Sequence, residues 1–118
     1  MLIPTKQQLE FLNWEIGAFF HFGIRSFFPG HEDWDGKPMP AEKFNPAELN
    51  CDQWMEAARA MGATYAIMTC KHRDGFALWP SRYTEYSVKN TPFGRDVVEL
   101  YVDACRKYGV KVGLYYSP

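Results

Sequence analysis

The chain has 118 residues, the length of one domain or part of one, and its hydrophobic content of 47% is ordinary for a globular protein. Its formal net charge is −1 with acids and bases interspersed, so it offers no basic surface for nucleic acid. It has no run of about 18 apolar residues, which argues against a transmembrane helix.

The N-terminal stretch 1–15 lacks the continuous apolar core of a signal peptide, so we expect a cytoplasmic protein. The three cysteines, Cys51, Cys70 and Cys105, are odd in number, widely spaced and set in periodic segments. This spacing predicts reduced, partly buried thiols rather than a disulfide framework or a zinc site. A reducing compartment is therefore favoured.

The first predicted unit is a strand, a long loop, a helix and a second strand. The run "IGAFFHFG" at 16–23 is apolar, aromatic and bounded by glycine, which predicts a strand. Residues 24–50 are rich in Pro, Gly, Asp and Glu and indicate a loop. Asn50, with a glutamine three residues later, predicts the capping box of a helix that Gly62 ends, and "TYAIMTC" at 64–70 predicts the second strand.

The second unit repeats this order. Residues 71–95 form another long polar segment, with Pro80, Pro92 and Gly94 as breakers. Asp96 with a glutamate three residues later predicts a second capping box, and Gly109 closes that helix. The run "VKVGLYYS" at 110–117 predicts the third strand.

Strands that alternate with helices predict an α/β fold with a parallel sheet and right-handed crossovers. Neither a GxGxxG loop nor a Walker loop follows a strand, so a nucleotide-binding fold is not supported. A (β/α)8-like TIM barrel is the leading architecture, but a full one needs about 250 residues. We therefore predict that 1–118 form one partial barrel domain with three strands and two helices. Its open strand edges could pair with a second copy and give a homo-oligomer.

Ionisable residues gather in "TCKHRDGF", directly after the second strand. Long loops after the strands of a parallel sheet usually carry the ligand site, so His72 and Arg73 are candidate site residues with Asp74 orienting them. His21 ends the first strand on the same edge. A solvated, charged turn is the alternative. A metal site that adds His31 is disfavoured because no HxH or HExxH spacing occurs, so we expect no metal and no cofactor.

An aromatic side chain in a loop is exposed to solvent unless it packs against another apolar surface. Asp33 and Trp34 lie in the middle of the first loop, where a tryptophan packs on the core or forms an apolar wall for a sugar. Trp79 and Tyr83 are expected to pack within the second loop. Trp54 lies on the apolar stripe of its helix and is expected in the core.

Four segments together resemble the α-L-fucosidase family of retaining glycoside hydrolases. They are "GAFFHFG", "KFNP" before a Trp-bearing helix, "KHRDGFALWPSRYTEYSVKN" and "DACRKYGVKVGLYYSP". The resemblance extends from Trp14 to Pro118, and the third segment is the most specific. It implies a catalytic (β/α) barrel whose ligand is a fucose-containing glycan or another small sugar.

The resemblance also implies roles for single residues. His21 would contact fucose hydroxyls. Asp33 and Trp34 match an acidic–Trp pair that supplies a hydroxyl contact and an apolar wall, with Asp where Glu is common.

His72 matches the first of two histidines after the second strand, and Arg73 replaces the second. Tyr115 matches a tyrosine near the nucleophile. We therefore predict a sugar-binding set of six residues: His21, Asp33, Trp34, His72, Arg73 and Tyr115.

Retaining glycosidases need two carboxyl groups about 5–5.5 Å apart. In the family that this chain resembles, the nucleophilic aspartate and the acid/base come later than residue 118, so we assign no catalytic residue within the chain. The resemblance implies hydrolysis of terminal α-L-fucosides with retention by a longer enzyme, while 118 residues alone would be inactive. A non-catalytic carbohydrate-binding or assembly module is the alternative.

Overall fold

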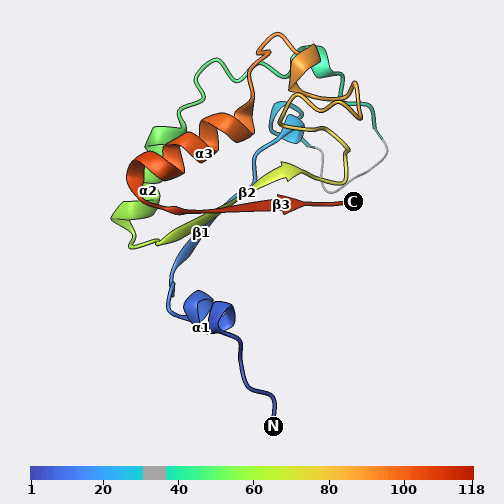
Figure 1. The fold of residues 1–118 in the computed structure, drawn as a ribbon. Helices are drawn as coiled ribbons and strands as arrows, with labels where there is room; N and C mark the ends of the chain where they lie inside the picture. The colour runs from blue at the N-terminus through green and yellow to red at the C-terminus, as the bar shows by residue number, and fades with distance from the viewer. Residues whose placement is uncertain (31–36) are drawn as a thin grey trace.

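The computed structural model describes residues 1–30 and 37–118. Three strands form one parallel sheet in the order β1–β2–β3, with bounds Gly17–Phe20, Tyr65–Lys71 and Lys111–Tyr116 (Figure 1). Phe20 of β1 lies beside Met68 of β2, and Met68 lies beside Leu114 of β3. The prediction of three parallel strands in chain order is confirmed. The predicted first strand was too long, because the ladder ends before His21.

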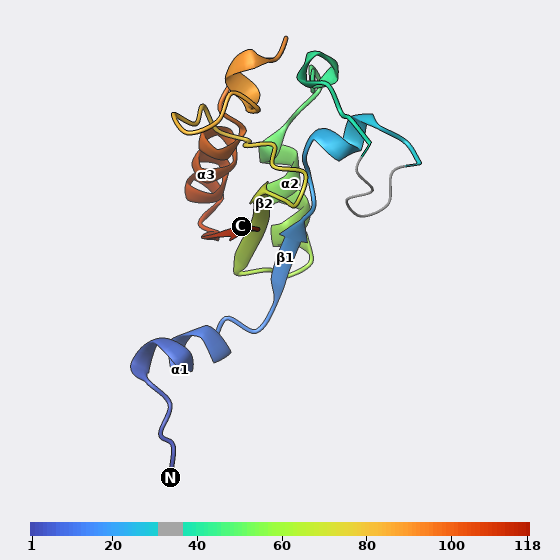
Figure 2. The same ribbon diagram turned by 90° about the vertical axis from the view of Figure 1, so that its right-hand side faces the viewer.

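Helices α2 (Cys51–Ala60) and α3 (Val97–Tyr108) lie together over one face of the sheet (Figures 1 and 2). Asn50 caps α2 by accepting from the backbone of Gln53, and Asp96 caps α3 in the same way. Gly109 takes the left-handed conformation at φ 67°, as expected for a residue that closes a helix. The caps therefore start both helices where the sequence predicts.

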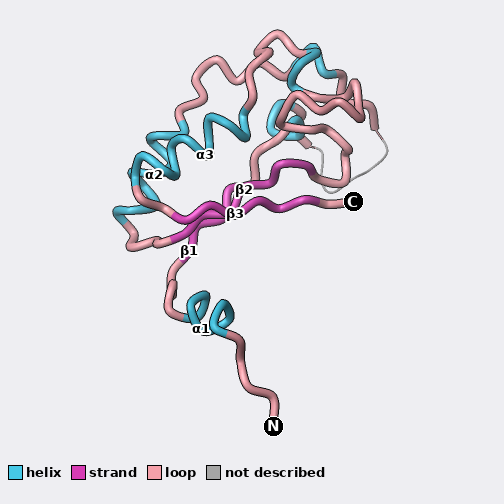
Figure 3. Tube along the Cα trace, in the orientation of Figure 1, coloured by secondary structure: helices cyan, strands magenta, loops and turns pink. Residues whose placement is uncertain are grey.

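A third helix, α1 (Lys6–Leu12), was missed by the sequence reasoning. It begins with a full capping box, in which Thr5 accepts from the Gln8 backbone and the Gln8 side chain accepts from the Thr5 backbone. That signal is present in the sequence. The helix lies on the other side of the sheet from α2 and α3, near its amino-terminal edge (Figure 3).

Aromatic contacts attach this N-terminal segment to the sheet. The ring centroids of Phe11, Trp14 and Tyr65 lie 5.5–5.7 Å from one another. The Thr64 hydroxyl also donates to the backbone oxygen of Trp14 at 2.5 Å. Since Trp14 comes after α1 and Tyr65 is the first residue of β2, the segment is fixed at the edge where the strands begin.

The core lies between the sheet and the two helices. Strand residues alternate, so Ala18, Ala66 and Met68 point toward the helices and are buried. Met55 of α2 and Tyr101 of α3 are fully buried against them. Tyr101 also donates its hydroxyl to the Gly113 oxygen at 3.2 Å. Burial raises the pKa of this phenol well above its ordinary value, so the donor stays protonated.

The long segments after β1 and β2 build a second part of the core at the carboxyl ends of the strands. They contain three short 3₁₀ helices: η1 (Ile24–Phe27), η2 (Ala41–Lys43) and η3 (Val88–Asn90). The rings of Phe44 and Phe76, one from each segment, lie 4.9 Å apart and are buried. The two loops therefore pack on each other as one layer.

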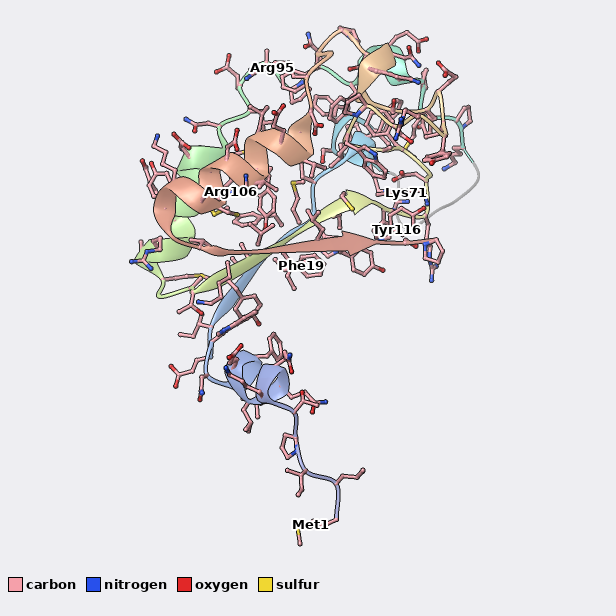
Figure 4. All side chains as sticks on the ribbon, in the orientation of Figure 1. Met1, Phe19, Lys71, Arg95, Arg106 and Tyr116 are labelled. Carbon is pink, nitrogen blue, oxygen red and sulfur yellow. The ribbon has the colours of Figure 1, made fainter. Side chains whose placement is uncertain are left out.

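The opposite face of the sheet is open. Phe19 points away from α2 and α3 (Figure 4) and is 49% exposed, and Tyr115 is 40% exposed. The total accessible area is 7798 Å², whereas a compact monomer of this size exposes about 6,600 Å². The open face of the sheet and the exposed N-terminal residues Met1, Leu2 and Ile3 contribute to this excess.

We predict that the isolated chain self-associates or is only marginally stable, because its apolar face is open and no described strand pairs with the outer edges of β1 and β3. Sedimentation velocity at micromolar concentration would show species larger than one chain, or calorimetry would show a weak transition. A monomer with a cooperative melt at high temperature would contradict this.

All three cysteines are free and buried, in agreement with the prediction of reduced thiols. Burial raises the pKa of Cys51 to about 11, and the neighbouring Cys105 adds to the effect. Burial also raises the pKa of Cys70 and of Cys105. These thiols are therefore protonated at neutral pH.

We expect the native chain to react slowly with Ellman's reagent at pH 8, because the attacking species is the thiolate and a pKa of about 11 leaves roughly one Cys51 in a thousand ionised. In denaturant all three should react rapidly. Fast reaction of one cysteine in the folded chain would show that this thiol is not buried.

Candidate functional site

Three of the predicted site residues meet at the carboxyl edge of the sheet. His21 directly follows β1, His72 directly follows β2, and Tyr115 is the fifth residue of β3. The His21 and His72 ring centroids are 6.0 Å apart, and His72 stacks on Tyr115 at 5.7 Å with an interplanar angle of 27°. The Phe19 ring centroid lies 4.3 Å from that of His21 and 5.8 Å from that of Tyr115. The three side chains therefore lie on the open face of the sheet.

A β-bulge in β2 determines which way His72 points. Thr69 pairs with Tyr115 and Lys71 pairs with Tyr116, so Cys70 is the extra residue. Strict alternation would place Lys71 on the side of Thr69 and His72 on the helix side. With the bulge, Lys71 instead lies over the Tyr116 ring at 4.7 Å (Figure 4), and His72 turns toward Tyr115.

Three hydrogen bonds to β3 and to the residue that follows it hold the bulge. The Cys70 thiol donates to the Tyr115 oxygen at 3.2 Å, and the Lys71 ammonium donates to the Ser117 oxygen at 2.6 Å. The Ser117 N–H donates in return to the Lys71 oxygen at 3.0 Å. The orientation of His72 is therefore fixed by the pairing of β2 with β3 rather than by its own contacts alone.

A cavity of about 240 Å³ opens at this edge. This is smaller than the roughly 300–1,000 Å³ of pockets that hold drug-sized ligands, so it suits a compact ligand such as one sugar ring. The following described residues line it: His21, Phe22, Gly23, Arg25, Ser26, Thr69, His72 and Asp74. It therefore combines two imidazoles, two hydroxyls and two charged groups of opposite sign.

A tight turn follows His72. The Gly75 N–H donates to the His72 oxygen at 3.0 Å, and Gly75 has φ 83°, a conformation that favours glycine. The Asp74 carboxylate accepts from the Phe76 N–H at 2.9 Å and also lines the cavity. Asp74 thus stabilises the turn while it lines the cavity.

The other predicted residues are placed differently. Arg73 occupies the turn and its side chain is exposed to solvent. Asp33 and Trp34 lie outside the described residues, as does His31. In the described part of the chain, no group of three or more His, Cys, Asp or Glu side chains could hold a metal ion.

Sequence reasoning missed five of the described residues that line the cavity, and three of them, Arg25, Ser26 and Thr69, carry polar side chains. Arg25 and Ser26 belong to η1, inside a segment that was predicted to be loop throughout. Thr69 was assigned only to the apolar strand. The position of Arg25 and Ser26 just after His21 was an available signal, since long segments at the carboxyl ends of parallel strands commonly carry binding residues.

Tyr86 ties the second loop to the first. Its hydroxyl donates to the Met39 oxygen at 2.6 Å, and its ring packs edge-on against Phe76 at 5.1 Å. Burial raises the pKa of Tyr86 to about 12, and the negative charge of Asp74 adds to it. By contrast, Tyr83 is 95% exposed, so the prediction that it packs within the loop was wrong.

We predict that Tyr86→Phe lowers the free energy of unfolding by about 1–2 kcal/mol, because the buried Met39 oxygen loses its donor. Tyr83→Phe is the matched control and should change it by less than about 0.5 kcal/mol. Urea unfolding at pH 7 gives both values, and equal effects would contradict the assigned bond.

Burial of the Tyr86 hydroxyl makes stability depend on alkaline pH. The pKa of Tyr86 is raised in the folded chain, so its contribution is complete below pH 10 and is lost as pH rises toward 12. The difference in stability between wild type and Tyr86→Phe should shrink across that interval. A difference that does not depend on pH would contradict this.

Comparison with known proteins gives the family. The sequence model described as alpha-L-fucosidase matches residues 38–118. The chain belongs to the α-L-fucosidase family. The resemblance stated from the sequence is thereby confirmed.

Individual relatives agree with this assignment. The chain is 42% identical over 123 residues to "Alpha-L-fucosidase 1" of Arabidopsis thaliana, with 98% of this chain and 23% of that protein covered. The structure of a glycoside hydrolase 29 family member from an unknown rumen bacterium superposes with a TM-score of 0.91, at 40% identity. That match covers 98% of this chain and 21% of the other.

A bacterial fucosidase crystallised with a monovalent iminocyclitol inhibitor superposes with a TM-score of 0.81, at 33% identity, over 97% of this chain and 30% of that one. The chain thus spans about a quarter of the length of the curated relatives it matches. Its parallel sheet corresponds to the N-terminal portion of the family's TIM-barrel-like domain. Within the described residues, no helix is both long and apolar enough to cross a membrane.

Proposed function

We propose that this chain is the sugar-binding N-terminal part of an α-L-fucosidase that hydrolyses terminal α-L-fucosides with retention. The observation that carries the proposal is the cavity at the carboxyl edge of the sheet, lined by His21 and His72, in a chain that belongs to the fucosidase family. The proposed ligand is the fucose unit of a glycan.

The chemistry of the cavity suits a polyol. A neutral imidazole has one donor and one acceptor nitrogen, and a sugar hydroxyl can complement either. Nδ1 of His72 is out of solvent contact and has no hydrogen-bond partner among residues 1–30 and 37–118. An unsatisfied buried polar atom costs about 1–3 kcal/mol, and this nitrogen gains a partner only if the ring or its neighbours move. Phe19 and Tyr115 add apolar surface beside the two histidines.

The roles of the remaining predicted residues belong to the same proposal. Arg73, which stands in place of the histidine that the family resemblance implies, would contact the sugar or its aglycone. Asp33 and Trp34 would supply a hydroxyl contact and an apolar wall.

Cleavage of the glycosidic bond requires catalytic carboxyl groups in addition to the sugar-binding residues. Retention uses a nucleophilic carboxylate and an acid/base about 5–5.5 Å apart. Of the described residues that line the cavity, Asp74 is the one carboxylate, and one of its oxygens accepts from Phe76. We therefore assign both catalytic carboxyl groups to residues later than 118 in the full enzyme.

We expect no hydrolysis of p-nitrophenyl α-L-fucoside by the 118-residue chain, because the two-carboxylate requirement is unmet. A longer chain that carries this sequence and continues the barrel should release p-nitrophenol. Turnover by the short chain that a substitution within it abolishes would move catalysis into these residues. An inactive longer chain that still binds fucose would favour a non-catalytic carbohydrate-binding module.

Binding can be tested separately with adjacent tyrosines. Tyr115 faces His72, whereas Tyr116 lies against Lys71 and Trp79 on the other side. We predict that Tyr115→Phe weakens binding of L-fucose or of an iminocyclitol roughly threefold to tenfold, the effect of one lost hydrogen bond. Tyr116→Phe is the matched control and should bind like wild type in calorimetric titrations. If Tyr116→Phe weakened binding more than Tyr115→Phe, the sugar would bind elsewhere on the chain.

A further inference from the structure

Thr69 makes a pair of hydrogen bonds that link β2 to the residue after His21. Its hydroxyl accepts from the Phe22 N–H at 3.1 Å and donates to the Phe22 oxygen at 2.8 Å. The Phe20 oxygen is 3.5 Å away, too far to compete for the single hydroxyl proton. Thr69 is 3% exposed, so water does not replace these bonds readily.

These bonds continue the attachment of β1 to β2 beyond the end of the backbone ladder. The last paired residues of the two strands are Phe20 and Met68. His21 comes next, and after it Phe22 is held at both its N–H and its oxygen by Thr69. The residue before His21 and the residue after it are therefore both fixed to β2, which leaves the His21 backbone little freedom.

The packing of Phe22 alone would not set this geometry. Its ring lies 5.4 Å from Trp54 and 5.9 Å from Phe44, in apolar contacts that tolerate rotation of the backbone. Hydrogen bonds to both polar atoms of one residue are directional and restrict its φ and ψ together. The His21 ring, 6.0 Å from the His72 ring, is exposed and has Phe19 as its nearest ring contact.

We propose that Thr69 is a positioning residue for His21. Its hydroxyl orders the exit of β1 and thereby holds the two imidazoles at the separation that the cavity presents to a ligand. That this separation serves sugar binding rests on the proposed function, whereas the positioning itself does not. No contact between Thr69 and the sugar is required.

The chain contains a matched control at the other end of the same strand. Thr64 precedes β2 and donates its hydroxyl to the Trp14 oxygen, so it too links β2 to the segment of β1 by a side-chain to backbone bond. Thr64→Val and Thr69→Val both remove a hydroxyl group, with the loss of one donated bond in Thr64→Val and of a donated and an accepted bond in Thr69→Val. The former lies at the edge where the strands begin, away from the cavity.

The test uses the 118-residue chain with three readouts: hydrogen exchange of the Phe22 amide, the ¹H–¹⁵N signals of the His21 imidazole, and the Kd for L-fucose. Thr69→Val should speed Phe22 exchange at least tenfold and shift the His21 signals. It should weaken fucose roughly threefold to tenfold, the fold-change of about one lost hydrogen bond. Thr69→Ser keeps the hydroxyl and should restore all three, and Thr64→Val should change none.

Unchanged His21 signals in Thr69→Val would overturn the proposal, even if Phe22 exchange rises. So would a Thr69→Ser variant as altered as Thr69→Val, because then the methyl group rather than the hydroxyl orders the loop. If Thr69→Val does not fold, the serine variant carries the test: wild-type His21 signals support the proposal and altered ones refute it. A wild-type chain that binds no fucose refutes the proposed function alone, since the first two readouts still decide the positioning role.

Discussion

The parallel pairing of β2 with both of its neighbours is the constraint on which the site depends. Because β2 is central, its register with β1 and β3 fixes the level at which each strand ends. His21 and His72 therefore leave the sheet at the same edge, beside Tyr115. The hydrogen bonds that hold this edge come from β2 itself: Thr69 reaches back to β1, and Cys70 and Lys71 reach across to β3.

The same arrangement explains why the remaining layers lie where they do. The helix side of β2 is buried under α2 and α3, and the loops that follow β1 and β2 pack on each other through Phe44 and Phe76. The opposite face keeps Phe19 and Tyr115 accessible. A parallel sheet ordinarily has both faces covered. The open face is thus both the surface that a complete barrel would enclose and the surface onto which the site residues project.

Much of the fold could be predicted because its signals are local. Asn50 and Asp96 start their helices through contacts three residues away, and Gly109 ends one through its own backbone conformation. The helix α1 was missed although Thr5 and Gln8 form a full capping box, because the helix has no buried residue and so lacks a clear apolar stripe. The exposure of Tyr83 was likewise unpredictable from a loop whose packing partners lie far along the chain.

The site was predictable only in part, for a related reason. The positions of His21 and His72 after parallel strands indicate a shared edge, and the family resemblance adds Tyr115. The bulge at Cys70 depends on pairing with a residue 45 positions away, and the Thr69 contact spans 47. Strict alternation within β2 would have turned His72 toward the helices. The local sequence pattern therefore predicts the edge at which the candidate site lies, while the orientation of its side chains comes from tertiary contacts.

The central claim is that this edge of the sheet binds a sugar, and the most direct test is a ¹H–¹⁵N titration of the chain with L-fucose that follows its backbone amides and histidine rings. The account predicts saturable shifts at His21, His72 and Tyr115, with none at Tyr65 and Lys111 at the other end of the strands. Shifts confined to the amino-terminal edge, or a spectrum unchanged at high fucose concentration, would contradict it.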